Sequence, residues 1–163
     1  MFNEEKIYKY IQQKDLILLM NSISFPFDTF ISYLFIILFK IIGIVTLKEI
    51  ILMNLCVFIG TFLKILIKRT RPYNKYDFVY NLTGKKHKNK TAEYSFPSGH
   101  TLTSTIFVLI IVNKYGYKGL YVVPFLVATS RVYLGVHYIS DVVCGMIIGI
   151  IYFNIIKKCK LIY

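Results

Sequence analysis

The chain carries a histidine and an aspartate four residues apart, at the start of its last apolar segment. His137 and Asp141 lie in SRVYLGVHYISD, residues 130–141. On a helix this spacing puts both side chains on one face, and helical side chains lean toward the N-terminus, which brings the carboxylate back toward the imidazole. A carboxylate on one ring nitrogen leaves the other nitrogen available as a nucleophile. Arg131 would add a guanidinium for a bound phosphate. The alternative is a structural His–Asp pair.

A second histidine follows a helix-start signal in SFPSGHT, residues 95–101. Ser98 can cap a helix, and Gly99 lets the backbone approach a ligand closely. The N–H groups of Gly99, His100 and Thr101 would then form an anion-binding helix N-terminus. His100 at its edge can give or take a proton near neutral pH. The alternative is an ordinary N-cap with an interfacial histidine.

A third group of polar residues ends an apolar segment in KILIKRTRP. Lys64 and Arg71 are seven residues apart, close to two helical turns, so both are expected on one helix face. Pro72 disfavours helical geometry at Arg71, and we expect the helix to stop there. A planar guanidinium fork and a point charge together suit a phosphate. The alternative is membrane-flanking charge, which Lys68 and Arg69 could supply alone.

Apolar segments must position these residues. The sequence is 56% hydrophobic with a mean hydropathy of +0.57, more apolar surface than a soluble domain of this length can bury. A membrane-spanning helix needs about 20 apolar residues. Five segments qualify or nearly qualify: 27–45, 47–68, 98–116, 120–135 and 138–156. The predicted fold is an all-α, multipass transmembrane helical bundle, with residues 1–163 as one domain.

Two further segments complete the predicted layout. Residues 1–24 alternate apolar and charged side chains, which indicates an interfacial amphipathic helix. Residues 73–96 form a basic loop that contains KKHKNK and the surface histidine His87.

The net charge of +12 lies mostly between apolar segments, so anionic lipid head groups, and not nucleic acid, are the predicted counterpart. The three cysteines match no metal or redox motif. The expected location is the cell membrane, and the sequence leaves the oligomeric state open.

Five alternating helices would gather all the unusual polar residues on one membrane face. That face receives the ends of segments 47–68 and 120–135 and the starts of segments 98–116 and 138–156. Outside the motifs, we count ten cationic residues on this face and six on the other. The positive-inside rule then points the face toward the cytoplasm.

The three motifs in this order resemble the type 2 phosphatidic acid phosphatase family. They are K-x6-RP, PSGH and SR-x5-H-x3-D, and they cover residues 64–141. The resemblance implies that His137 attacks phosphorus to form a phosphohistidine, that Asp141 orients it, and that His100 protonates the leaving oxygen and then activates water. It also implies that phosphoryl oxygens are held by Lys64, Arg71, Arg131 and the backbone at Ser98 and Gly99.

The family is regarded as metal-independent, so neither a metal nor another cofactor is expected. Many relatives carry proline at the position of Ile139, and six spans are common among them, whereas this sequence shows five. Bacterial relatives generally place the site outside the cell, against the charge count.

The expected activity is a membrane phosphatase acting on a lipid phosphate or diphosphate. Phosphatidic acid, phosphatidylglycerophosphate and undecaprenyl diphosphate all fit, because the motifs read the phosphate and not the tail. Two alternatives stay open: a lipid phosphotransferase of the same family, and a non-catalytic membrane scaffold or transporter-like protein.

Overall fold

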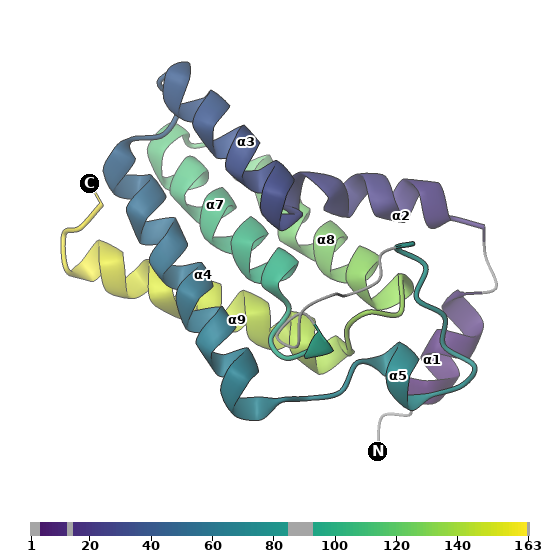
Figure 1. The fold of residues 1–163 in the computed structure, drawn as a ribbon. Coiled ribbons are helices and arrows are strands. Elements are labelled where there is room, and N and C mark those ends of the chain that lie inside the picture. The colour runs from purple at the N-terminus through teal and green to yellow at the C-terminus, as the bar shows by residue number, and fades with distance from the viewer. Residues whose placement is uncertain (1–3, 13–14, 85–92, 163) are drawn as a thin grey trace.

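A computed structural model describes residues 4–12, 15–84 and 93–162 of the chain (Figure 1). This described part is all-helical apart from an isolated bridge between Thr70 and Tyr94, which confirms the all-α part of the predicted fold. The elements in order are α1 (Glu4–Ile11), α2 (Ile17–Ser24), the 3₁₀ turn η1 (Phe25–Phe27), α3 (Thr29–Ile41), α4 (Leu47–Ile67), α5 (Pro72–Lys75), α7 (Gly99–Tyr115), the 3₁₀ turn η2 (Lys118–Tyr121), α8 (Val122–Tyr133) and α9 (Ile139–Lys158).

Helix α7 lies at the centre of the bundle, packed against α4, α8 and α9 (Figure 1). Two glycines let α9 approach it closely. A Cβ on Gly145 would lie 2.9 Å from the Ser98 carbonyl oxygen, and one on Gly149 would lie 2.9 Å from Thr105 Cγ2. The G-x-x-x-G pattern in α9 therefore serves packing within the chain, and it brings the start of α9 against the start of α7.

The outward faces of the bundle are apolar. Ile41, Phe58 and Phe125 are each at least 60% exposed, and comparable side chains cover α3, α4, α8 and α9. An apolar surface of this extent is not stable in water but suits contact with lipid tails. The buried charged side chains lie instead near the two ends of α7, with Glu49 at one end and Arg71, Arg131 and Asp141 at the other.

All five predicted apolar segments contain a helix, namely α3, α4, α7, α8 and α9. Within the described residues, α4 and α9 are long and apolar enough to cross a bilayer. A bent pair, Ile17–Phe27 with Ile31–Ile41, would add a third crossing if the two helices form one span. The 12 residues of α8 extend only about 18 Å, less than the hydrocarbon thickness. A total of five crossings stays a prediction.

The segment 1–24 contains two helices, α1 and α2, where the sequence predicts one. The residues on either side of the break between α1 and α2 contact Tyr133 at the end of α8. The Leu16 N–H donates to the Tyr133 hydroxyl at 2.9 Å, and Gln12 Nε2 donates to the carbonyl oxygen of Tyr133. The membrane-surface position of this segment stays a prediction. In the predicted basic loop 73–96, residues 85–92, including His87, lie outside the described residues.

Candidate active site

His137 lies in the turn between α8 and α9, and the N-terminal helix holds that turn in place. The Tyr8 hydroxyl, itself buried, donates to the carbonyl oxygen of His137 at 2.7 Å. Gly135 in the turn has a φ of +73°, and the backbone of Tyr80 and the side chain of Gln12 fill the space where a Cβ would stand. A side chain at position 135 would therefore be both strained and obstructed. The imidazole is 2% exposed.

The predicted pairing of His137 with Asp141 is present as a close approach. Nδ1 of the imidazole lies 3.5 Å from Oδ2 of the carboxylate, which is long for a hydrogen bond, and Nδ1 has no other partner within the described residues. The same Oδ2 accepts from the Tyr138 N–H at 3.0 Å, as the capping box of α9. Helix capping thus fixes the carboxylate beside the ring.

The other ring nitrogen of His137 faces cations. Its Nε2 lies 3.4 Å from Nη1 of Arg71. Burial, followed by the positive charges of Arg71, Lys64 and Arg131, holds the pKa of His137 well below its usual range. The imidazole is therefore neutral near pH 7, the form in which a ring nitrogen can act as a nucleophile.

Arg69 lies beside the candidate site, although its position in the sequence indicates only membrane-flanking charge. Its Nη1 donates to Asp141 Oδ1 at 2.6 Å and to Ser140 Oγ at 2.7 Å, and its guanidinium lies 3.9 Å from the centre of the Tyr138 ring. Pro72 could have indicated this position of Arg69, because a proline favours extended backbone in the residue before it. In extended backbone, residues 69 and 71 face the same side.

Lys64 and Arg71 reach one cavity, but not from one helix face. Helix α4 ends at Ile67, and Lys68 caps it in the left-handed conformation with φ of 49°. Arg71 is extended, with ψ of 153°, as expected before a proline. The prediction that the helix continues to Arg71 is therefore wrong. On one continuous helix, seven residues would separate the two charges by about 10 Å along the axis. Because α4 ends early, Arg71 is not held at that separation from Lys64.

The start of α7 faces the cavity with Gly99 and His100. Their N–H groups belong to the first helical turn, which has no intrahelical acceptors. Ser98 caps the helix, and its Oγ accepts from the Thr101 N–H that the sequence analysis expected to contact an anion. The Ser98 N–H also has a different use, since it donates to the Asp141 carbonyl oxygen at 3.0 Å. Ser98 thus joins α7 to α9 behind the cavity.

The cavity itself has a volume of about 350 Å³. The charged and imidazole side chains in its wall are Asp28, Lys64, Arg71, His100, Arg131 and His137, beside Gly99 and the polar residues Ser32, Tyr33, Asn54, Thr61 and Thr103. Arg131 is buried, and its Nη1 reaches Ser24 Oγ at 3.3 Å while its Nε has no partner within the described residues. Three cationic side chains and two imidazoles around one small space suit a tetrahedral anion. Asp141 stands behind His137 and does not line this space.

No group of three or more His, Cys, Asp or Glu side chains able to hold a metal ion occurs in the described parts of the chain.

The chain is similar to several known proteins. A model of the PAP2 superfamily matches residues 31–161. A lipid A 4'-phosphatase of Porphyromonas gingivalis is 30% identical over 80% of this chain and 59% of its own length. An undecaprenyl-diphosphatase of Sulfolobus acidocaldarius is 32% identical over 58% of this chain and 45% of its own length. The chain thus spans about half the length of these curated relatives.

A solved structure is similar over nearly the whole fold. The transmembrane PAP2-type phosphatidylglycerolphosphate phosphatase from Bacillus subtilis superposes with a TM-score of 0.74 at 26% identity, covering 95% of this chain and 83% of that one. The crystal structure of Aquifex aeolicus LpxE shares the fold, with a TM-score of 0.69 at 23% identity, over 94% of this chain and 93% of that one. Since the family model matches most of its residues, the chain belongs to the PAP2 superfamily.

Proposed function

We propose that this chain is a multipass protein of the cell membrane that hydrolyses a lipid phosphate through a phosphohistidine at His137. The observation that carries the proposal is the single cavity onto which His100, His137 and three cationic side chains open. Phosphoryl transfer needs positioning and charge stabilisation more than covalent chemistry from the protein, and this cavity supplies both.

In the first step, Nε2 of His137 attacks phosphorus while the bond from phosphorus to the lipid oxygen breaks. His100 donates its proton to that leaving oxygen, so a neutral lipid alcohol departs. Asp141 beside Nδ1 stabilises the positive charge that the ring gains. Lys64, Arg71 and Arg131 hold the phosphoryl oxygens in the transition state.

In the second step, a water molecule attacks the same phosphorus. His100, now without its proton, accepts one from the water as the new phosphorus–oxygen bond forms. The phosphorus–nitrogen bond to His137 then breaks, and inorganic phosphate leaves with both imidazoles returned to their initial state.

The lipid tail has an apolar space beside the phosphate cavity. A cavity of about 170 Å³ is lined almost entirely by apolar side chains, with Phe35, Phe39 and Phe107 beyond the shared wall. It shares Phe27, Ile36 and Met53 with the phosphate cavity. A tail held here would leave the phosphate directly against the cations.

The proposal is tested by measuring phosphate release by the purified full chain in detergent micelles. Phosphatidic acid and undecaprenyl diphosphate are the probes, each with and without EDTA. We expect turnover that EDTA leaves unchanged, and its loss by at least about 10³-fold in His137→Ala. His87→Ala is the matched control, because the mechanism does not use that histidine. Full activity in His137→Ala would exclude the phosphohistidine.

A further inference from the structure

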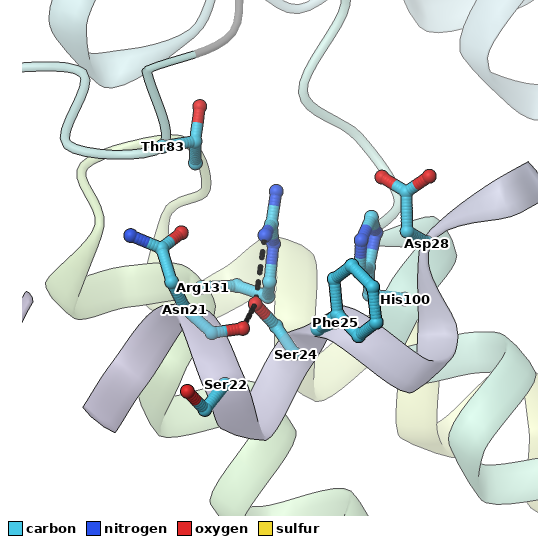
Figure 2. A pocket seen from close by; sticks show the side chains of 8 residues that line it. All are labelled: Asn21, Ser22, Ser24, Phe25, Asp28, Thr83, His100 and Arg131. Atoms are coloured by element: carbon cyan, nitrogen blue, oxygen red, sulfur yellow. Dashed lines mark hydrogen bonds between the residues drawn. The ribbon is translucent and has the colours of Figure 1, made fainter. Parts of the chain in front are cut away.

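Asp28 stands among the cations of the candidate site, and the proposed mechanism gives it no role. It lines the phosphate cavity and also a neighbouring cavity of about 410 Å³, whose other lining residues come mostly from α2, η1 and the chain after α5. In both walls it is joined by His100 and Arg131. Figure 2 shows Asp28 and His100 at the same end of the neighbouring cavity. Asp28 is the one carboxylate in the described walls of the two cavities.

The carboxylate of Asp28 is not used to start its own helix. Asp28 is the N-cap of α3, a position where an aspartate usually accepts a hydrogen bond from the first helical turn, and its side chain makes no such bond. Its backbone is held by neighbours along the chain, because its N–H donates to the Phe25 carbonyl oxygen at 3.1 Å and its own carbonyl oxygen accepts from the Ser32 N–H at 2.7 Å. The preceding turn η1 packs against α7. The junction of η1 and α3 thus holds Asp28 in the wall that α7 supplies with His100.

His100 otherwise faces cations and a second imidazole. The other charged and imidazole side chains in the described wall of the phosphate cavity are Lys64, Arg71, Arg131 and His137. Nearby positive charges disfavour a protonated imidazole, whereas a nearby carboxylate favours it. The first proposed step requires that proton, because His100 must pass it to the leaving oxygen. Among the described side chains of this wall, Asp28 alone has the charge that retains it.

The two histidines of the cavity have different surroundings. His137 is 2% exposed, and its carboxylate neighbour Asp141 stands behind it, outside the cavity. His100 is half-buried, and Asp28 stands in the cavity wall with it. Two titratable groups in different environments suit different roles in one reaction. The difference favours His137 as the neutral nucleophile and His100 as the acid.

We propose that Asp28 is a positioning residue that keeps His100 protonated until the leaving oxygen takes the proton. Asp28 itself stays ionised and transfers no proton, so the bonds that form and break are those of the two proposed steps. This inference rests on the proposed function, because it assigns Asp28 to the step in which His100 acts as an acid.

The test compares two phosphate monoesters that depend on the acid to different degrees. The alcohol of phosphatidic acid needs a proton as it leaves, whereas a nitrophenolate is stable as an anion, so the second probe is a para-nitrophenyl phosphate that carries an alkyl chain. Asp28→Asn removes the charge and keeps the size of the side chain. With the purified full chain in detergent micelles, we expect kcat/KM for phosphatidic acid to fall about tenfold or more in this variant and that for the nitrophenyl probe to stay within about threefold.

Asp77→Asn is the matched control. Asp77 is an exposed aspartate in the chain after α5 and lines neither cavity, so both rates should be unchanged in this variant. Asp28→Glu retains the charge, and the ratio of its two rates should lie closer to that of the original chain than the ratio in Asp28→Asn does. Both rates are measured on one preparation, so a misfolded fraction lowers them equally and leaves the ratio unchanged.

The outcomes separate this inference from the proposed function. An equal fall for both probes would mean that Asp28 acts on phosphate binding through Arg131, with which it interacts electrostatically. That result, an unchanged rate for phosphatidic acid in Asp28→Asn, or a ratio in Asp28→Glu as altered as in Asp28→Asn overturns this inference while the phosphatase stands. Phosphate release from neither probe by the original chain, or full release by His137→Ala, overturns the proposed function and this inference with it.

Discussion

The two ends of α7 bury charged side chains in opposite ways. At the C-terminal end, Lys114 Nζ lies 3.3 Å from Glu49 Oε2 and donates to the Ile44 carbonyl oxygen at 3.0 Å. The same carboxylate oxygen accepts from the Thr46 N–H at 2.6 Å. One acid meets one base, and backbone groups complete the hydrogen bonds. This end links the α3–α4 turn to α7, and its buried acid and base are paired with each other.

At the N-terminal end of α7, the cations of the described residues outnumber the carboxylates that face the same cavity. The Asp141 carboxylate accepts hydrogen bonds from Arg69 and from the Tyr138 N–H at the start of α9. Asp28 is the one carboxylate in the described wall of the phosphate cavity. Buried cations that are not balanced by nearby carboxylates lower the stability of the fold. We infer from this contrast that one end of the bundle serves stability and that the other suits an anion, which would bring the missing negative charge.

The largest effect is expected from Arg131→Met at the cationic end. Loss of a transition-state cation should lower kcat/KM about 10²- to 10³-fold. Because the guanidinium is buried with an unpartnered Nε, the unfolding midpoint should stay equal or rise. Phosphate release and thermal unfolding in detergent measure the two effects. A clear fall in the midpoint would mean that Arg131 is a structural residue.

The opposite pattern is expected from Lys114→Met at the matched end. The variant leaves the Glu49 carboxylate buried without its base, at a cost of about 2–4 kcal/mol of unfolding free energy. Turnover per folded molecule should stay within about twofold. Adding Glu49→Gln should restore part of the stability, since it removes the unpaired charge. A loss of turnover equal to that in Arg131→Met would erase the distinction between the ends.

A smaller effect is expected from Arg69→Met. Asp141 then loses a charge-assisted hydrogen bond, and kcat should fall about tenfold with KM within about twofold. Arg69→Lys should recover part of the rate, and single-turnover formation of the phosphohistidine should slow in parallel. Lys68→Gln, at the neighbouring exposed lysine, is the control. A rise in KM alone would place Arg69 in substrate binding.

The smallest effect concerns the titration of His137. Neighbouring cations and burial lower the pKa of its imidazole, so the ring should stay neutral as the pH falls through the usual histidine range. Arg71→Met removes one of those charges and should raise that pKa by about one pH unit or less. Nitrogen-15 NMR of histidine-labelled protein, assigned with His100→Gln, measures both. A midpoint in the original chain above the ordinary histidine value would contradict the electrostatic picture.

The sequence predicted the helices well because lipid contact leaves a clear apolar pattern in each segment. It also placed Lys64, Arg71, His100, Arg131 and His137 on one face, and they do line one cavity. Alternation of the helices was sufficient there: α4 and α8 end, and α7 and α9 begin, on the side of the bundle where the cavity lies. Element ends were less predictable: Lys68 turns left-handed and ends α4 four residues before Arg71, and nothing in its residue type signals that.

Contacts between distant segments were the part that sequence could not supply. Arg69 reads as membrane-flanking charge until the fold brings it to Asp141, 72 positions later. The cavity lined by Asn21, Thr83 and Arg131 likewise forms only because the fold brings α2 and the chain after α5 next to α8. These pairings depend on tertiary packing, for which no local periodicity exists.

The contact between Tyr8 and His137 has a consequence for how the protein is made. The two residues are 129 positions apart, so a ribosome synthesises the first helix long before the turn on which it docks. The turn that carries His137 can acquire this support only after residue 137 has been synthesised. A chain interrupted before His137 would therefore carry Lys64, Arg71 and Arg131 without the proposed nucleophile or the turn that Tyr8 supports.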